Sequence, residues 1–214
     1  IPFHHALSSE QEKAYRTIAP YVREKSHANF LLQGVTGSGK TELYVRLIND
    51  TLEQGRSVIC LVPEIALTIH LINYFKEHFA ENLEVLHSKL TDAQRFAAWC
   101  RIRAGVRRVI VGPRSALFSP VWNPGLIIMD EEHENSYKQQ DAPRYHARDV
   151  ARTFAQMTGS VFVAGSATPS LEIRHATTTD TVTLLRLDKR ISDLSLPEVK
   201  VIDLKNDPIF RQQI

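Results

Sequence analysis

Cysteine, methionine and tryptophan are scarce, with two of each in the 214 residues. The two cysteines, Cys60 and Cys100, lie far apart without C-x-x-C spacing, so they predict neither a zinc motif nor a disulfide framework. No apolar run approaches the roughly 20 residues that a membrane-spanning helix needs. An initiator methionine and a signal-peptide pattern are also lacking. We therefore expect a piece of a longer cytoplasmic protein with reduced thiols and no membrane partner.

Charge of either sign is not in excess, because 26 Lys and Arg oppose 24 Asp and Glu for a net charge of +2. This balance permits nucleic acid as a partner without indicating it. A hydrophobic content of 43% is ordinary for a globular protein, and the length suits one large α/β domain. There is no internal repeat or low-complexity tract.

A glycine-rich octapeptide, G-V-T-G-S-G-K-T, stands between an apolar run at 29–33 and a helical pattern at 42–48. Strand, glycine loop and helix in this order predict a phosphate-binding loop. Glycines let backbone N–H groups wrap a polyphosphate at the helix N-terminus, where Lys40 reaches the β- and γ-phosphates and Thr41 binds Mg²⁺. A chance glycine turn is the alternative, and the complete pattern argues against it. The predicted nucleotide-binding residues are Gly34, Val35, Thr36, Gly37, Ser38, Gly39, Lys40 and Thr41.

The first predicted helix begins at Ser8 or Ser9 and ends near Arg23. Gln11 precedes the glycine loop by the interval at which many nucleic-acid motors place an adenine-reading glutamine. An exposed helix glutamine is the alternative.

Two acids follow a compact apolar strand at 126–129. In a phosphoryl-transfer site, Asp130 would hold Mg²⁺ together with Thr41, and Glu131 would polarise the attacking water. The predicted catalytic residues are thus Lys40, Asp130 and Glu131. A solvated acidic loop is the alternative.

Further buried strands are predicted at 57–63, 83–86, 106–112, 161–164 and 182–187, and another at 198–203. Helical patterns at 69–79, 91–104 and 148–157 separate most of them. Apolar strands alternating with helices predict an α/β fold with a mainly parallel central sheet and helices on both faces, a three-layer α/β/α arrangement.

A polar, basic and aromatic segment at 134–149 follows the two acids. Its rings can stack on unpaired bases and its cations can meet phosphates, which predicts DNA binding coupled to hydrolysis. The alternative is a surface loop whose tyrosines pack on the domain. Ser166 and Thr168, at a later strand end, offer hydroxyls that could sense the nucleotide, or they form a simple polar turn. The segment's candidate residues are Tyr137, Lys138, Arg144, Tyr145 and His146.

Five motifs stand in a recognisable order: G-V-T-G-S-G-K-T, L-V-P-E-I-A-L-T, G-P-R-S-A-L-F-S-P, D-E-E-H and G-S-A-T-P-S. This set resembles the superfamily 2 helicases. The segments S-Y-K-Q-Q and R-Y-H-A-R-D-V-A resemble those of the bacterial primosomal replication-restart helicases. Pro113 departs from the threonine that this family more often has before the arginine and serine.

The resemblance implies a RecA-like P-loop NTPase fold, with residues 1–203 as the first motor lobe and 204–214 as the start of a linker to a second lobe. It implies ATP and Mg²⁺ as cofactors, and it places the family's zinc module and arginine finger outside this chain. It also implies 3′-to-5′ DNA unwinding at stalled forks, with single-stranded and forked DNA, primosome proteins and single-strand-binding proteins as partners. The DNA contacts that it implies are Pro63, Glu64, Arg114 and Ser115.

Two other functions remain open from the sequence. One is a different superfamily 2 motor, such as an RNA helicase or a restriction-type translocase. The other is a non-catalytic ATP-binding or docking module, which the intact Lys40, Thr41, Asp130 and Glu131 argue against. We expect the isolated lobe to be nearly inactive, because no second lobe supplies an arginine.

Overall fold

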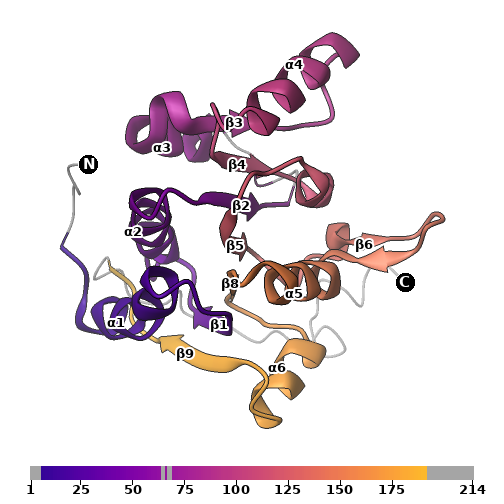
Figure 1. The fold of residues 1–214 in the computed structure, drawn as a ribbon. Helices are drawn as coiled ribbons and strands as arrows, with labels where there is room; N and C mark the ends of the chain where they lie inside the picture. Colours follow the sequence, from indigo (N-terminus) through magenta and orange to yellow (C-terminus); the bar gives the residue numbers. More distant parts are fainter. Residues whose placement is uncertain (1–5, 64–65, 67–68, 192–214) are drawn as a thin grey trace, which may run out of the picture.

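The computed structural model describes residues 6–63, 66 and 69–191. A central sheet of seven strands has the order β3-β4-β2-β5-β8-β1-β9, and all of its pairings are parallel (Figure 1). Its strands are β1 (Ala28–Gly34), β2 (Ser57–Leu61), β3 (Leu83–Val85), β4 (Val109–Gly112), β5 (Pro124–Met129), β8 (Val161–Ser166) and β9 (Thr183–Leu187).

Among the described residues, six helices cover the two faces of this sheet (Figure 1). One apolar cluster joins the sheet to α1, α2 and α3, and a second joins the opposite face to α4, α5 and α6. This arrangement confirms the predicted three-layer α/β/α fold. The helices are α1 (Ser9–Arg23), α2 (Lys40–Glu53), α3 (Ile69–Phe79), α4 (Asp92–Arg103), α5 (Ala147–Thr158) and α6 (Leu171–Thr178), with 3-10 turns at η2 (Ala80–Asn82), η3 (Arg114–Phe118) and η4 (Asn135–Tyr137).

Successive side chains of each central strand point to opposite helical layers. In β1, Phe30 and Leu32 belong to the cluster under α1 and α2, whereas Leu31 belongs to the cluster under α5 and α6. Because both faces are covered, these strands are apolar throughout, which is why they could be predicted as continuous runs rather than as alternating patterns.

Most predicted boundaries hold, and the exceptions have local causes. The helix start at Ser8 is confirmed, since Ser8 and Gln11 form a reciprocal capping box. The prediction that a strand begins at Val106 is wrong: the N–H groups of Val106 and Arg107 both donate to the carbonyl of Arg101, so the turn after α4 continues and β4 starts at Val109. The predicted strand at 198–203, the linker at 204–214 and the candidate residue Glu64 lie outside the described residues.

The basic and aromatic segment forms a small hairpin rather than an open loop. Strands β6 (Lys138–Gln139) and β7 (Tyr145–His146) pair antiparallel and lead directly into α5 (Figure 1). Within the described part of the chain, no helix is long and apolar enough to cross a membrane.

Candidate nucleotide and nucleic-acid site

The predicted site residues gather at one edge of the sheet. Strands β5, β8 and β1 are neighbours and run parallel, so their carboxyl ends lie side by side. β1 leads into the glycine loop, β5 into the D-E-E-H segment and β8 into G-S-A-T-P-S. Open α/β sheets bind ligands outside the carboxyl ends of their strands.

The glycine loop is a tight turn that ends at the N-terminus of α2. Gly39 precedes the helix at φ 76°, and a Cβ there would lie 2.3 Å from Gln11 Nε2 and 2.2 Å from Ile191 Cδ1, so only glycine fits. Lys40 Nζ donates to the carbonyl of Gly34 (3.1 Å) and lies 3.9 Å from Glu131 Oε1. The glycine loop and the acids are therefore in contact.

The loop also fits a polyphosphate. The first N–H groups of α2 have no partners within the helix, which is the usual anion-binding arrangement. Ser38 Oγ is buried and has no hydrogen-bond partner among the described residues. A hydroxyl donor in that state, beside N–H groups and Lys40, fits phosphate oxygens.

Gln11 is 1% exposed, so the alternative of an exposed helix glutamine is wrong. Its Oε1 accepts from the N–H of Ser8 (2.7 Å), and its Nε2 donates to the carbonyls of Ser38 (3.0 Å) and Gly39 (3.1 Å). The amide thus fixes the phosphate loop in this conformation. Reading of adenine by Gln11 stays a prediction.

Asp130 is half-buried, and its carboxylate is held by Tyr44, whose hydroxyl donates to Asp130 Oδ1 (2.9 Å). Burial raises the pKa of the Asp130 carboxyl, while the Tyr44 hydrogen bond and the charge of Lys40 oppose the rise and Glu131 adds to it. A bound cation would favour the charged form. Together with the Thr41 hydroxyl, this oxygen donor suits Mg²⁺.

Glu131 sits in a strained backbone conformation beside it. Its φ is 46°, in the left-handed region that non-glycine residues rarely adopt, at a cost of about 1–3 kcal/mol. Hydrogen bonds on both sides hold it there: the N–H of Asp130 donates to Leu61 (2.9 Å) and that of Glu132 donates to Gly165 (3.0 Å). The strain turns the Glu131 side chain toward Lys40.

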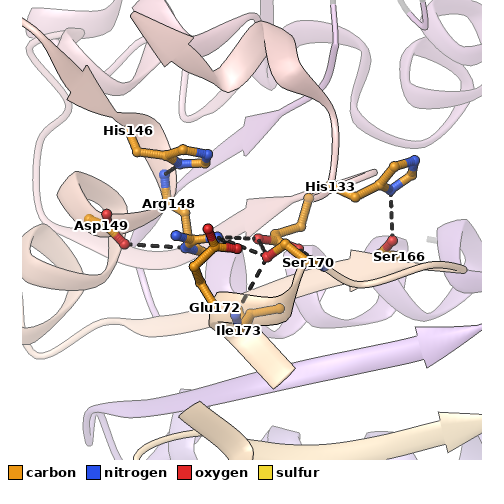
Figure 2. A network of polar contacts seen from close by, with 9 residues as sticks. His133, His146, Arg148, Asp149, Ser166, Ser170, Glu172 and Ile173 are labelled. Carbon is orange, nitrogen blue, oxygen red and sulfur yellow. Dashed lines mark hydrogen bonds and ion pairs between the residues drawn. The ribbon is translucent and has the colours of Figure 1, made fainter. Parts of the chain in front are cut away.

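The D-E-E-H segment also contacts the G-S-A-T-P-S turn. His133 Nδ1 lies 2.8 Å from Ser166 Oγ, and the N–H of Thr168 donates to the same hydroxyl (3.1 Å) (Figure 2). His133 Nδ1 is also 3.6 Å from Glu131 Oε2. The His133 ring therefore connects the Ser166 hydroxyl to the Glu131 carboxylate. The Thr168 side chain is not part of this contact.

A second polar cluster was not predicted from the sequence. Glu132 is joined to Arg148 and Ser170 by hydrogen bonds, and Arg148 and Ser170 are also hydrogen-bonded to each other (both labelled in Figure 2). Arg148 and Ser170 belong to recognisable segments, but no sequence signal pairs them with the third residue of D-E-E-H.

The prediction that the Tyr137 ring stacks on unpaired bases is wrong, because the ring is buried. The ring is 1% exposed and its hydroxyl donates to the carbonyl of Asp130 (2.6 Å), so the alternative of a tyrosine packed on the domain holds. Tyr145 is half-buried with its ring edge against Phe118, and His146 caps α5 by accepting from the N–H of Arg148. Lys138 and Arg144 of the hairpin are exposed.

A hollow of about 570 Å³ opens between α4, η3 and the hairpin. Of the predicted DNA contacts it includes Arg114, Ser115 and Tyr145, whereas Pro63 is buried and does not line it. Arg114 donates to the carbonyls of Ser136 (2.6 Å) and Lys138 (3.1 Å), which ties η3 to the hairpin. Sequence reasoning missed other polar and aromatic residues of this hollow, namely His87, Arg95, Trp99 and Phe118.

No group of three or more His, Cys, Asp or Glu residues that could hold a metal ion occurs among the described residues.

The family model described as "DEAD/DEAH box helicase" matches residues 8–176. The replication restart protein PriA of Chlamydia trachomatis is 43% identical, in an alignment covering 100% of this chain and 30% of that protein. PriA of Haemophilus influenzae is 48% identical, covering 86% of this chain and 26% of that protein. The chain thus spans about a quarter to a third of the length of these relatives.

Solved structures confirm the fold. RecG bound to a three-way DNA junction is similar with a TM-score of 0.65 at 21% identity, over 90% of this chain and 25% of that one. The Hef helicase domain of Pyrococcus furiosus gives a TM-score of 0.56 at 19% identity, over 94% of this chain and 39% of that one. At these identities the likeness is one of fold.

Proposed function

The chain belongs to the DEAD/DEAH box helicase family, and we propose that it is the first RecA-like motor lobe, residues 1–203, of an ATP-dependent 3′-to-5′ DNA helicase. The single observation that carries this proposal is the meeting of the glycine loop with the acids, where Lys40 Nζ lies 3.9 Å from Glu131 Oε1. Its likeness at 37–48% identity to replication restart proteins named PriA supports replication restart as its role.

Bound ATP with Mg²⁺ supplies the phosphoanhydride that is cleaved and the cation that neutralises its charge. Lys40, which donates to Gly34, would turn to the β- and γ-phosphates, and Ser38 and the loop N–H groups would bind the remaining oxygens. Thr41 and Asp130 would hold the Mg²⁺. Glu131 would accept the proton of the attacking water, a role that its position 3.9 Å from Lys40 Nζ supports.

The hollow beside the acids fits a single strand. Arg95 and Arg114 supply cations for the phosphate backbone, and the rings of Trp99 and Phe118, 40% and 58% exposed, offer faces for unpaired bases. Ser166 and the hairpin would link strand binding to the nucleotide. Lys138, Arg144, Tyr145 and His146 remain candidates for that contact, and Tyr137 would act from inside the fold, through Asp130.

The complete protein would include a second lobe that contributes the arginine finger, joined through a linker starting at 204–214. Its partners would be single-stranded and forked DNA, primosome proteins and single-strand-binding proteins. Without the second lobe we expect this chain to hydrolyse ATP slowly, because such arginines contribute roughly 10³–10⁵-fold to the rate.

The test is ATP hydrolysis by the complete protein in the presence of forked DNA, plain duplex or RNA. We expect stimulation by DNA that has single-stranded parts, strongest with forks. Stimulation by RNA alone would favour an RNA helicase, and hydrolysis that no nucleic acid stimulates would reject the motor. A DNA-stimulated rate in the isolated chain equal to that of the complete protein would overturn the need for a second lobe.

A further inference from the structure

Next to the acids lies a cluster of Glu132, Arg148 and Ser170, which we call the Glu132 clamp; Glu132 and Arg148 are buried and Ser170 is half-buried. Figure 2 shows Arg148 and Ser170 of this cluster. The Glu132 side chain is 0% exposed and that of Arg148 is 8% exposed. Glu132 Oε1 accepts from Arg148 Nη1 (2.8 Å) and from the Ser170 hydroxyl (2.7 Å), while Oε2 accepts from the N–H of Ser170 (3.1 Å). Arg148 Nη1 also donates to Ser170 Oγ (2.9 Å), which closes a triangle.

The clamp joins three segments that the proposed function uses. Glu132 belongs to D-E-E-H after β5. Arg148 is in the first turn of α5, immediately after the β6–β7 hairpin, and Ser170 is the N-cap of α6 at the end of G-S-A-T-P-S. Taking a carboxylate and a guanidinium out of water is costly, and apolar residues of the same volume would often stabilise a fold as well or better. A role besides stability is therefore worth testing.

The clamp holds Glu132, the residue that directly follows Glu131 in the chain. Tyr137 and Leu61 hold Asp130 on one side of Glu131. On the other side, Glu132 is held through its own N–H to Gly165 and through its carboxylate to the clamp. Since Glu131 adopts a left-handed conformation, its orientation depends on both neighbours staying fixed.

The clamp is a second polar connection from the hairpin to the backbone at Glu131, beside that of Tyr137, which directly precedes β6 and whose hydroxyl donates to the carbonyl of Asp130. The hairpin ends at His146, which accepts from the N–H of Arg148 (3.2 Å). A shift of the hairpin on binding a strand would move the start of α5, and Arg148 would carry that shift to Glu132.

We propose that Glu132, Arg148 and Ser170 form a positioning clamp, which sets Glu131 for hydrolysis and transmits the position of the hairpin to it. The inference rests on the proposed function and adds three positioning residues to it. None of them touches nucleotide; each acts through the placement of Glu131.

The test uses the complete protein with the double substitution Glu132→Gln and Arg148→Met. It removes both charges together, because removal of Arg148 alone would leave the fully buried Glu132 carboxylate without its cation and would destabilise the fold. Arg148 itself also pairs with the exposed carboxylates of Asp149 (3.2 Å) and Glu172 (3.7 Å). We expect a folded protein whose affinities for a non-hydrolysable ATP analogue and for single-stranded DNA stay within about twofold of wild type, while its DNA-stimulated kcat falls at least about tenfold.

Asp50, Arg23 and Tyr15 supply a control. Asp50 is likewise a buried carboxylate held by an arginine (2.9 Å) and a hydroxyl (2.9 Å), although the Arg23 side chain is 54% exposed and that of Arg148 is 8% exposed. Asp50 lies ten residues along α2 from Lys40, about 15 Å away. The double substitution Asp50→Asn and Arg23→Met should leave DNA-stimulated kcat within about twofold of wild type. An equal loss of kcat in both double variants would overturn the clamp in favour of a general effect of losing a buried carboxylate and its arginine.

Ser170→Ala keeps the ion pair and covers the case in which the first double variant does not fold. It should lower DNA-stimulated kcat, and Ser170→Thr should restore it, at unchanged affinity for the analogue. Wild-type kcat in Ser170→Ala, or in the folded Glu132→Gln and Arg148→Met protein, rejects the clamp. If the wild-type protein itself shows no stimulation by DNA, the proposed function fails instead, and the two failures are thereby distinguished.

Discussion

Two arginines are buried at opposite ends of the parallel strands, and they differ in what they contact. We call the side of the sheet where the strands begin the amino edge and the side where they end the carboxyl edge. Arg56 precedes β2 at the amino edge, where it donates only to backbone carbonyls, those of Pro124, Thr158 and Gly159. Arg148 stands at the carboxyl edge, where it meets the carboxylate of Glu132 and the hydroxyl of Ser170. They are 3% and 6% exposed, so burial alone does not distinguish them.

The contacts of the two arginines indicate a structural role for the amino edge and a functional role for the carboxyl edge. Burial lowers the pKa of Arg56, and no carboxylate opposes that effect. Burial also acts to lower the pKa of Arg148, but the hydrogen bond and charge of Glu132, with Asp149, raise it overall. Arg56 donates to the carbonyls of Pro124 at the start of β5 and of Thr158 and Gly159 at the end of α5, and so holds these elements together. Arg148 connects polar side chains of three motifs and so belongs to the site. The amino edge should therefore control stability, and the carboxyl edge catalysis.

The largest expected effect is at the carboxyl edge. Glu131→Gln in the complete protein should lower kcat for ATP at least about 100-fold, because a general base of this kind contributes 10²–10⁴-fold. Affinity for ATP should stay near wild type, since Lys40 and the glycine loop remain. Steady-state hydrolysis and binding of a fluorescent ATP analogue measure the two quantities. Glu134→Gln, three residues further on, is the control and should keep wild-type turnover. A kcat within tenfold of wild type in Glu131→Gln would remove Glu131 from this role.

The next effect is at the amino edge and should appear in stability alone. Arg56→Met keeps the aliphatic packing but removes the arginine donor from the carbonyls of Thr158 and Gly159, while that of Pro124 keeps the Ser160 hydroxyl as donor. The free energy of unfolding should therefore fall by about 2 kcal/mol. Urea denaturation of this chain measures it, with Arg16→Met as control, because Arg16 is 77% exposed in a surface pair with Glu12 and should change stability by less than about 0.5 kcal/mol. In the folded state, the complete protein carrying Arg56→Met should retain its kcat. A lower kcat there would break the division between the two edges.

A third prediction tests how far the carboxyl edge extends toward α4. Trp99 lines the hollow beside Arg114, whereas Phe96 on the same helix does not line it although it is 68% exposed. Trp99→Ala should weaken single-stranded DNA binding by about tenfold, the usual effect of losing one stacked base. Phe96→Ala should leave it unchanged. Fluorescence anisotropy with a labelled oligonucleotide measures both, and equal affinities in the two variants would place the strand elsewhere.

The residues of the carboxyl edge that the sequence could predict are those that lie in short contiguous motifs. Gly34–Thr41 and Asp130–Glu131 were identified because each motif follows its own strand, and parallel strands bring their carboxyl ends together. The partner of Glu132 could not be predicted, since Arg148 reaches it only after the hairpin has folded back. The same holds for Tyr137, whose residue type suits a base as well as a protein core, and for Trp99, which no motif includes.

The smallest expected effect is a pH dependence at the hairpin. Burial lowers the pKa of His146, and the charge of Arg148 lowers it further, against opposing contributions from Asp149, Glu132 and Glu172. The neutral ring is required, because Nδ1 accepts from the N–H of Arg148. Since the folded pKa is below the unfolded value, the stability that His146 contributes is complete above about pH 6.5 and is lost as the pH falls through the folded pKa.

His146→Asn keeps a capping acceptor that does not titrate, so the loss of stability between pH 7.5 and 5.5 should be smaller than in wild type, by less than about 1 kcal/mol. Urea denaturation at both values compares the two proteins, and the other histidines cancel in the difference. An identical loss in both would mean that His146 does not sense pH at the carboxyl edge.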